Sequence, residues 1–220
     1  MRRFLHRMSR DQSGATTIEF TIVMLLFFML TFGITEFGYM LWQYNSAAKA
    51  AQLGARLAAV SDPIWGGLTI LTDTGTPGAA WETNYTVTCT SDSEDGSSGD
   101  CDGTFTGNYD ADAMQCLVFG RKAGDVPPCD TVCAETGIDG ENGICDRYPY
   151  ITAENISITY THTGLGFAGR PGGPVPTITL QLTDLTFDFF ALGAFLGFDQ
   201  ITMPDFEVTM TGEDLNGAAP

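Results

Sequence analysis

The chain has 220 residues, with 10 Lys and Arg against 27 Asp and Glu, so its formal net charge at pH 7 is −17. That length predicts one soluble domain in addition to any membrane anchor. The acidic balance argues against DNA or RNA as a partner, because nucleic-acid binding depends on cationic side chains that neutralise phosphates. Such a charge suits solubility and repulsion between copies outside a membrane.

One long apolar stretch dominates the N-terminal part of the chain. No charged residue lies between Phe20 and Ile34, and the apolar character continues to Trp42. A helix needs about 20 residues to cross a ~30 Å hydrocarbon core, and extending the run to Tyr39 provides them. We therefore expect one membrane-spanning helix, with Tyr39, Trp42 and Tyr44 in the outer interfacial belt of aromatic residues.

Basic residues before this stretch predict its orientation. Arg2, Arg3, Arg7 and Arg10 all precede the apolar run. Lys49 and Arg56 follow it only at a distance. Positively charged flanks stay on the cytoplasmic side of a membrane. The sequence therefore predicts a single-pass protein with its N-terminus in the cytoplasm and the remainder exported.

An isolated acid stands near the start of the apolar run. Glu19 follows Gly14 by five positions, and a carboxylate within the hydrocarbon costs about 2.5–3.5 kcal/mol, so it marks function by default. The order of basic leader, Gly14-Ala15, Glu19-Phe20 and apolar run resembles the processing site of type IV prepilins and pseudopilins. In that family a membrane-embedded prepilin peptidase cuts after the glycine. The resemblance implies cleavage between Gly14 and Ala15.

Cleavage at this bond would give Glu19 a partner. It would create a positively charged amine on Ala15, and four residues make about one helical turn, so amine and carboxylate would lie at nearly the same depth. Glu19 can pair with its own amine or with a neighbour's. The family resemblance favours the neighbour, which would make Glu19 an assembly residue. The alternative is that Glu19 merely reaches interfacial water.

The wider stretch is similar to the TadE-like proteins of tight-adherence (Tad, or Flp) pilus systems. Three motifs of that family occur here, as Gly14-Ala15 with Glu19-Phe20, Gly33-Ile34-Thr35-Glu36-Phe37-Gly38 and Gly54-Ala55-Arg56. One departure is Leu25, where the family often has proline. The resemblance implies a minor pilin or pseudopilin anchored in the bacterial inner (cytoplasmic) membrane. Its implied partners are the prepilin peptidase, other pilins and pseudopilins, the pilus assembly machinery and inner-membrane lipid.

Two features leave alternatives open. Glu36 lies near the expected outer interface, where it is either a solvated acid or a contact between neighbouring subunits. Small residues near Ala50 also allow a conventional signal peptide cleaved there, which would release a secreted protein. The charge of Glu36 and the aromatic residues that follow it fit a signal peptide poorly.

After Leu41 the pattern becomes that of an amphipathic helix. Leu53, Leu57 and Val60 recur at helical spacing, and the alanines and Gly54 permit close approach of another backbone. We expect this part to pack on the protein's own sheet, and to add contacts between subunits. The segment Ser61-Asp62-Pro63 ends the helix.

Residues 61–150 are rich in glycine, proline and acids, and we expect loops there. All six cysteines of the chain lie in this part: Cys89, Cys101, Cys116, Cys129, Cys133 and Cys145. An even number on the exported side predicts three disulfides, with about 15 pairings open. Their spacing is unlike that of zinc ligands, and the acidic loop 90–102 lacks the register of a calcium site. We expect no metal and no cofactor.

The composition shifts to Ile, Val, Thr and Phe from Ile151 onward. Alternating residues predict strands at 156–163 and 177–183, joined by a long Gly- and Pro-rich loop, and a third strand at 206–211. The Phe-rich stretch 185–198 is too short for a second span and contains Asp188. There we expect a strand end followed by a buried or interface loop.

The expected fold class is α+β. A long N-terminal transmembrane and amphipathic helix packs on a small antiparallel sheet, as the pilin resemblance implies, beside a disulfide-rich loop region. The expected parts are a cytoplasmic leader (1–14), a transmembrane helix continuing as an amphipathic spine (15–60), an exported Cys-rich acidic region (61–150) and an exported β-rich region (151–220).

No arrangement of residues indicates catalysis. His162 is the sole histidine after the leader, and we expect it on a strand surface rather than in a Ser-His-Asp or Cys-His site. Phosphate-binding and dinucleotide-binding motifs are absent from the sequence. We expect a pilus assembly protein that is not an enzyme. The alternative is a membrane-anchored adhesion protein whose disulfide-stabilised head binds a surface.

Overall fold

The computed structural model describes residues 12–71, 76–122, 129, 133, 140–169, 175–190, 192, 193, 197 and 200–212. Its elements are α2 (Gln12–Val60), η1 (Gly66–Ile70), β1 (Thr86–Ser91), β2 (Gly99–Gly103), α3 (Ala111–Phe119), β3 (Gly120–Lys122), β4 (Gly140–Asn142), η2 (Ile144–Asp146), η3 (Ala153–Asn155), β5 (Ile156–Thr161), β6 (Thr177–Leu182), β7 (Thr186–Phe187), β8 (Ile201–Thr202) and β9 (Phe206–Thr211). The chain forms two compact units, of which the first comprises Met1–Trp42 with Thr186–Ile201, and the second comprises Gln43–Leu185 with Thr202–Pro220.

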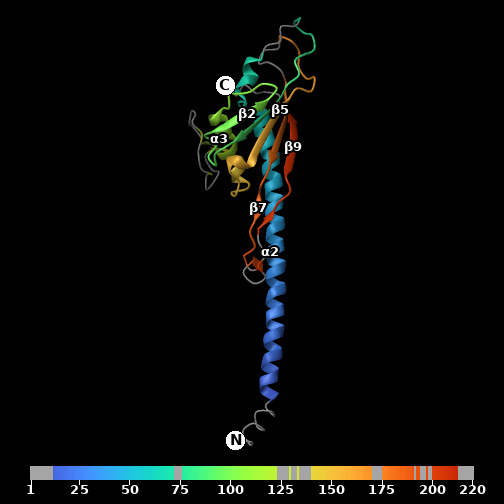
Figure 1. Cartoon of the computed structure of the whole chain (residues 1–220), viewed down its shortest axis with the longest axis vertical. Helices are drawn as coiled ribbons and strands as arrows, with labels where there is room; N and C mark the ends of the chain where they lie inside the picture. Colours follow the sequence, from blue (N-terminus) through green and yellow to red (C-terminus); the bar gives the residue numbers. More distant parts are fainter. Residues whose placement is uncertain are drawn as a thin grey trace, which may run out of the picture. The chain divides into compact units, whose positions relative to one another are not determined.

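Five antiparallel strands form the sheet of the second unit, in the order β2-β1-β5-β6-β9 (Figure 1). The three predicted strands are confirmed as β5, β6 and β9, with β5 and β6 slightly shorter than expected. Inward side chains alternate along the strands, so Ile158 lies opposite Cys89 on one neighbour and Leu180 on the other. All three side chains are buried. This alternation is the signal from which the central strands were predicted.

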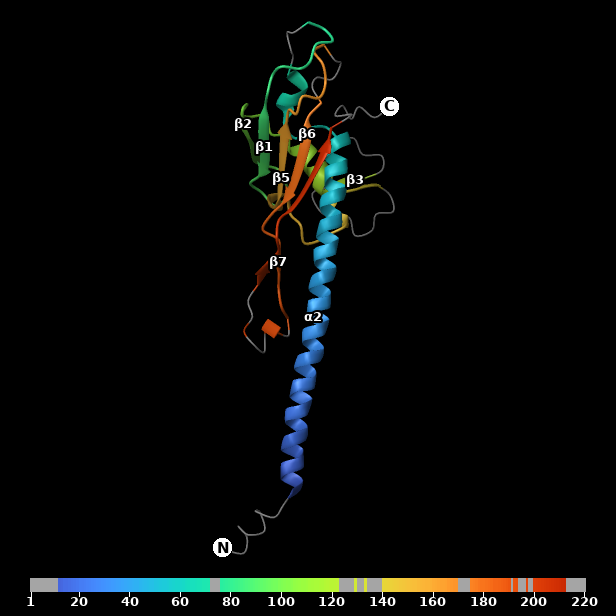
Figure 2. The same cartoon turned by 90° about the vertical axis from the view of Figure 1, so that its right-hand side faces the viewer.

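The C-terminal part of α2 packs on this sheet through its smallest residues (Figure 2). Its buried face consists of Ala47, Ala50, Ala51, Gly54, Ala55, Ala58 and Ala59. A Cβ on Gly54 would lie 2.5 Å from Cδ1 of Ile144 and 2.9 Å from Cδ1 of Leu180. The helix can approach the core this closely only because its side chains are small.

The Leu53, Leu57 and Val60 stripe does not form the buried face of the helix. Leu53 and Leu57 are half-buried, and Val60 is exposed. Size rather than hydropathy decides which face of this helix meets the sheet, because larger side chains would hold the helix away from the buried Leu180.

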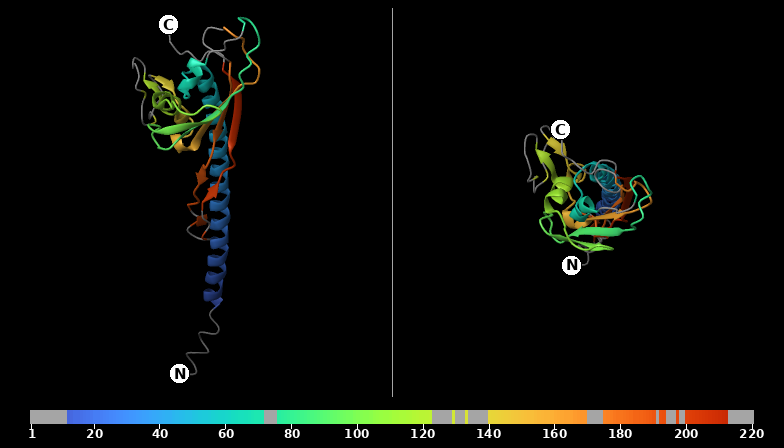
Figure 3. Two further views of the ribbon diagram at one scale, coloured as in Figure 1. Left: turned by 45° about the horizontal axis from the view of Figure 1, so that its top comes forward. Right: turned by 90° about the horizontal axis from the view of Figure 1, so that it is seen from above.

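Residues 61–150 contain regular elements that the loop prediction did not include, among them β1, β2, α3, β3 and β4. Strands β1 and β2 pair with each other, and α3 lies beside the sheet (Figure 3). Asp110 caps α3, because its Oδ1 accepts a hydrogen bond from the backbone N–H of Ala113 at 3.1 Å. Gly120, at φ +81°, ends the helix with a backbone conformation that favours glycine.

The first unit combines the N-terminal part of α2 with an apolar loop, residues 186–201. Short strands β7 and β8 pair at the base of this loop. The Phe187 ring lies 6.0 Å from Tyr39, and the Phe189 ring lies 5.9 Å from Phe37. The expected strand end in 185–198 corresponds to β7. A long apolar N-terminal helix, an antiparallel sheet and three disulfides confirm the α+β class.

Candidate functional site

The expected processing segment lies in the first turns of α2. The helix begins at Gln12, and the residues from Gly14 to Phe20, Ala15 among them, are exposed. A Cβ on Gly14 would meet no atom within 4 Å. Within the described part of the chain, the Glu19 carboxylate has no hydrogen bond and no ion pair. Its charge is therefore available to a partner other than these residues.

Beyond Glu19, α2 presents large apolar side chains outward. The exposed large apolar residues include Phe20, Ile22, Val23, Leu25, Leu26, Phe27, Phe28, Leu30, Phe32, Ile34 and Phe37. Ile34, for example, is 67% exposed. An exposed belt of this kind is unfavourable in water and favourable in lipid. By length and composition, the helix can cross a membrane.

The polar side chains within this belt are satisfied locally. Thr21 donates to the carbonyl of Thr17 at 2.8 Å, and Thr31 donates to the carbonyl of Phe27 at 2.8 Å. Thr35 donates to the carbonyl of Thr31 at 2.9 Å. Hydroxyls that bond back to the helix one turn earlier leave no donor unpaired in hydrocarbon. These threonines therefore suit a lipid-facing helix.

The belt has the length of a bilayer core. From Glu19 to Tyr39 a helix rises about 30 Å, which equals a typical hydrocarbon thickness. The acid marks one end, and the rings of Tyr39 and Trp42 stack at the other with centroids 5.7 Å apart. Aromatic residues with polar groups favour the membrane–water boundary. The interfacial positions of Glu19 and of the aromatic belt stay predictions that follow from this length.

Glu36 has a partner that the sequence did not reveal. Its Oε2 accepts a hydrogen bond from the backbone N–H of Leu192 at 3.0 Å, and its side chain is half-buried. The sequence suggested either a solvated acid or a contact between subunits. In the structure Glu36 instead binds a loop of its own chain, through the backbone of Leu192. A charged acceptor makes a stronger hydrogen bond than a neutral one.

Gln43 is a second residue that sequence analysis missed. Among the residues of α2 whose burial is described, it is the first buried one, and the Tyr148 hydroxyl donates to its Oε1 at 3.5 Å. Gln43 precedes Ala47 and Ala50 at helical spacing, which was the available signal. It marks the residue at which α2 changes from large exposed side chains to small buried ones.

The six candidate cysteines form three disulfides between sequence neighbours. The pairs are Cys89–Cys101, Cys116–Cys129 and Cys133–Cys145, with Cα atoms 4.1, 4.9 and 5.7 Å apart. The number of disulfides is confirmed, and the pairing is one that the sequence left open. Bonded sulfur atoms are not available as thiolate ligands for zinc.

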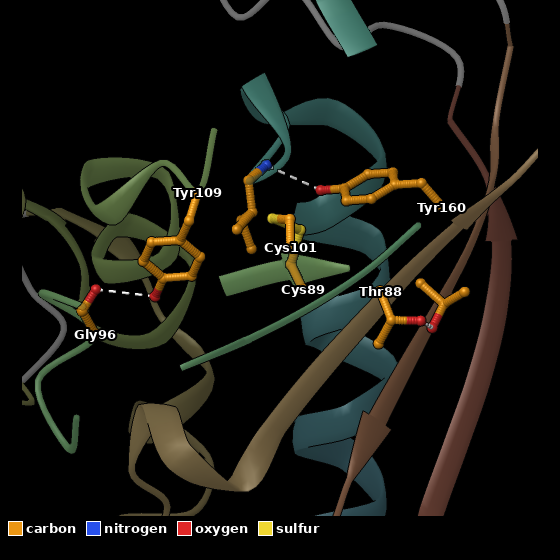
Figure 4. Close-up of a disulfide and its surroundings, with 8 residues drawn as sticks. Thr88, Cys89, Gly96, Cys101, Tyr109 and Tyr160 are labelled. Atoms are coloured by element: carbon orange, nitrogen blue, oxygen red, sulfur yellow. Dashed lines mark hydrogen bonds between the residues drawn. A yellow bond between two sulfur atoms is a disulfide. The ribbon is translucent and has the colours of Figure 1, made fainter. Parts of the chain in front are cut away.

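The first disulfide joins the partner residues of β1 and β2 inside the core (Figure 4). Nearby, the Tyr160 hydroxyl accepts a hydrogen bond from the backbone N–H of Ile64 at 2.9 Å. Burial raises the pKa of Tyr160, so the ring stays neutral. The Tyr109 hydroxyl donates to the carbonyl of Gly96 at 2.9 Å and fixes the turn between the strands.

The acidic loop 90–102 is a β-hairpin rather than a free loop. Ser97 donates to Asp95 Oδ1 through its hydroxyl at 2.7 Å and through its backbone N–H at 3.0 Å. These hydrogen bonds lower the pKa of Asp95, which is fully exposed. Among the described residues, no group of three or more His, Cys, Asp or Glu side chains could hold a metal ion.

The expectation that His162 lies on a strand surface was wrong. Its side chain is 8% exposed, and its ring lies 5.8 Å from that of Tyr85. Nδ1 lies 3.4 Å from Oδ1 of Asn84, while the buried Nε2 has no hydrogen-bond partner. The imidazole is therefore packed beside an aromatic ring, without a nucleophile in its described contacts.

Comparison with known proteins bears on the N-terminal part of the chain. A family model described as "TadE-like protein" matches residues 14–56. This range contains Gly14, Glu19 and Glu36, and it ends among the small residues that pack on the sheet. No curated protein and no solved structure matches the chain. Over residues 14–56 the chain is therefore similar to TadE-like proteins, and this range includes the apolar part of a helix that is long enough to anchor it in a membrane.

Proposed function

We propose that this protein is a minor pilin or pseudopilin that acts in Tad (Flp) pilus assembly and is cut after Gly14 by a prepilin peptidase. One observation carries the proposal: the family match covers a helix on which Gly14 and Glu19 precede an exposed apolar belt. The basic leader before Gly14 stays in the cytoplasm, and the disulfide-bonded sheet is exported from the inner membrane.

The position of Gly14 in the first helical turn favours proteolysis. The first N–H groups of a helix have no intrahelical acceptor, and glycine is a poor helix former, so this end opens at little cost. Hydrolysis of the Gly14–Ala15 bond adds water, leaving a carboxylate on Gly14 and an ammonium group on Ala15. The shortened helix then starts at Ala15, and Glu19 lies about one turn further along.

Glu19 is the residue that we assign to assembly. A negative side chain near a helix N-terminus is favourable, and a new ammonium group at similar depth adds a full positive charge. An unpaired charge is unfavourable in hydrocarbon, both for the Glu19 carboxylate and for the Ala15 ammonium group. Pairing of Glu19 with the amine of a neighbouring subunit therefore drives lateral association. Other pilins and the assembly machinery are the partners, and the role is structural rather than enzymatic.

Substitution of Gly14 tests the processing step. We expect Gly14→Ala to keep its leader, because the peptidase recognises glycine, while the fold is unaffected because nothing lies near a Cβ there. Gly33→Ala is the matched control, since its Cβ also meets no atom within 4 Å. The measurement is the mass of the protein extracted from the native membrane. An unchanged mature mass in Gly14→Ala would remove cleavage after Gly14 from the proposal.

Substitution of Glu19 tests assembly separately from processing. We expect Glu19→Ala to be cut normally but to assemble poorly, because the neighbour's amine loses its partner. Ile18→Ala, which also removes an exposed side chain, is the control. Pili are counted by electron microscopy, and the mature mass is measured on the same cells. Normal pilus numbers in Glu19→Ala would overturn the assembly role.

An adhesion protein is the second candidate, and the outer face of the sheet favours it. Threonine hydroxyls line this face, with Thr88 2.9 Å from Thr159 and Thr179 3.1 Å from Thr209. Such a flat hydroxyl-rich surface can bind a polar ligand. Capture of inner-membrane pilus components with the full chain supports the pilin role. Surface binding without any such capture supports adhesion.

A further inference from the structure

The apolar loop 186–201 has a composition that its fold alone does not explain. Residues 189–198, between Asp188 and Asp199, carry no charged and no hydrogen-bonding side chain. Phe190 is 90% exposed. A phenylalanine so exposed, within an uncharged stretch, is characteristic of a binding surface or a lipid contact.

The loop is held against the exposed apolar belt of α2. The Phe187 ring packs 6.0 Å from Tyr39, and the Leu192 N–H donates to Glu36 at 3.0 Å. Leu192 further lines an apolar groove of about 670 Å³ with Met24, Phe28 and Phe32 of the helix. The loop therefore continues the surface of the helix that faces lipid.

The contacts along α2 give the depth of the loop. Tyr39 belongs to the aromatic end of the belt, and Phe32 is seven residues, or about 10 Å, further into the span. Apolar segments that lie in a membrane interface reach about 5–10 Å below the headgroups. Asp188 precedes the uncharged stretch and Asp199 follows it. Asp188 can remain near the polar boundary while Phe190 and Leu192 lie deeper.

We propose that the described part of this loop, residues 186–190 with Leu192, inserts into the outer leaflet of the membrane as a second lipid contact beside α2. The occupant of its exposed face is the acyl-chain region of phospholipid, because the loop adjoins the part of α2 that already requires lipid. A second protein would have to displace lipid from both surfaces. The inference depends on anchoring of α2 in a bilayer, and it does not depend on leader removal or pilus assembly.

Fluorescence quenching by brominated lipid tests the insertion. The full chain carrying Phe190→Trp is reconstituted in phosphatidylcholine vesicles whose acyl chains are brominated close to the headgroup, and its emission is compared with that in unbrominated vesicles. Tryptophan is larger than phenylalanine, but the fold should be spared because the Phe190 side chain is 90% exposed. The parent chain, with its three tryptophans, provides the background to subtract. Tyr150→Trp, exposed on the sheet domain, is the matched control.

The expected result is that the emission added by Phe190→Trp is mostly lost in brominated vesicles, while that added by Tyr150→Trp is unchanged. Added emission that resists bromine and resembles that of tryptophan in water would overturn the proposal by placing the loop outside the bilayer. Added emission that resists bromine but is blue-shifted and depends on protein concentration would also overturn it, in favour of a second copy of the chain.

Discussion

The two parts of helix α2 differ in which side chains they expose and which they bury. From Gly14 to Trp42 the helix exposes phenylalanine, leucine and isoleucine, and few of its side chains are even half-buried. From Gln43 to Val60 it buries alanines and Gly54 against the sheet. In the first part large apolar side chains are exposed, and in the second part small side chains are buried.

The contrast shows that hydropathy alone does not locate the core of this protein. The most apolar residues face outward because lipid is their solvent. The buried face of the second part is only moderately apolar, but it permits close approach of backbone to sheet. Stability is therefore concentrated in the disulfide-bonded sheet unit, and the membrane-related function in the first part of α2.

Removal of the core disulfide should have the largest effect on stability. We expect the Cys89→Ala and Cys101→Ala double variant to lose about 2–5 kcal/mol of unfolding free energy, because the unfolded chain gains freedom. Denaturant unfolding of the detergent-solubilised full chain measures the loss. Resistance to extraction from membranes by alkali should stay unchanged. A variant that unfolds like the parent, or leaves the membrane, would contradict the division between the two parts.

A matched pair of glycines probes the two parts of α2 directly. Gly54→Ala should destabilise the protein by about 1–3 kcal/mol, because its Cβ would overlap Ile144 and Leu180 in a packed core. Gly33→Ala meets no atom within 4 Å and should be neutral or slightly stabilising, since alanine favours helix. Thermal unfolding of both variants makes the comparison. Equal melting temperatures would mean that the helix does not pack tightly on the sheet.

Loss of the α3 cap should have a smaller effect within the sheet unit. Asp110→Ala removes the acceptor for the Ala113 N–H and should cost about 1 kcal/mol. Asp110→Asn keeps an acceptor oxygen and should restore most of the stability. Asp112→Ala, in the first turn of the same helix but not its cap, is the control. If Asp110→Ala unfolds at the same denaturant concentration as Asp112→Ala, the cap contributes nothing.

The smallest expected effect is on how stability depends on pH, to which Asp146 and Asp95 contribute with opposite signs. Burial raises the pKa of Asp146, so its stabilising contribution is complete below the ordinary value of 3.8 and is lost as the pH rises through the higher folded value. Hydrogen bonds from Ser97 lower the pKa of Asp95, so its contribution is present above 3.8 and is lost as the pH falls. Asp95 is fully exposed and Asp146 is only half-buried, which keeps both effects small.

Unfolding across an acidic pH series separates the two carboxylates. Asp146→Asn should become more stable relative to the parent as the pH rises, whereas Asp95→Asn should become less stable. The same trend in both variants would show that net charge, rather than the local surroundings of each group, sets the pH dependence.

Three strands of the five-stranded sheet could be predicted from the sequence, and the other two could not. Strands β5, β6 and β9 alternate β-branched and polar residues, and each was predicted close to its observed bounds. Strand β2 reads Gly-Asp-Cys-Asp-Gly, a composition typical of turns. It forms a strand because Cys101 is bonded to Cys89 on the neighbouring strand. This constraint joins cysteines 12 residues apart in the sequence, and local propensity does not contain it.

In the candidate site, too, some features could be predicted from the sequence and others could not. The spacing of Gly14 and Glu19, and the exposed belt after them, could be identified from sequence because both depend on neighbours along one helix. The Glu36–Leu192 hydrogen bond joins residues far apart in the chain, and the burial of His162 depends on contact with Tyr85. Neither leaves a periodic signal. The pairing of the cysteines likewise could not be chosen from the sequence, because it depends on which residues the fold brings together.

The N-terminal residue of the native protein, determined on material extracted from its own membrane, decides whether the leader is removed from an anchored helix. We expect the polypeptide to start at Ala15, with the apolar part of α2 intact. A protein that retains Met1 while its host makes normal pili would contradict leader removal. A protein that starts near Ala50 would show that the apolar stretch is a signal peptide and not an anchor.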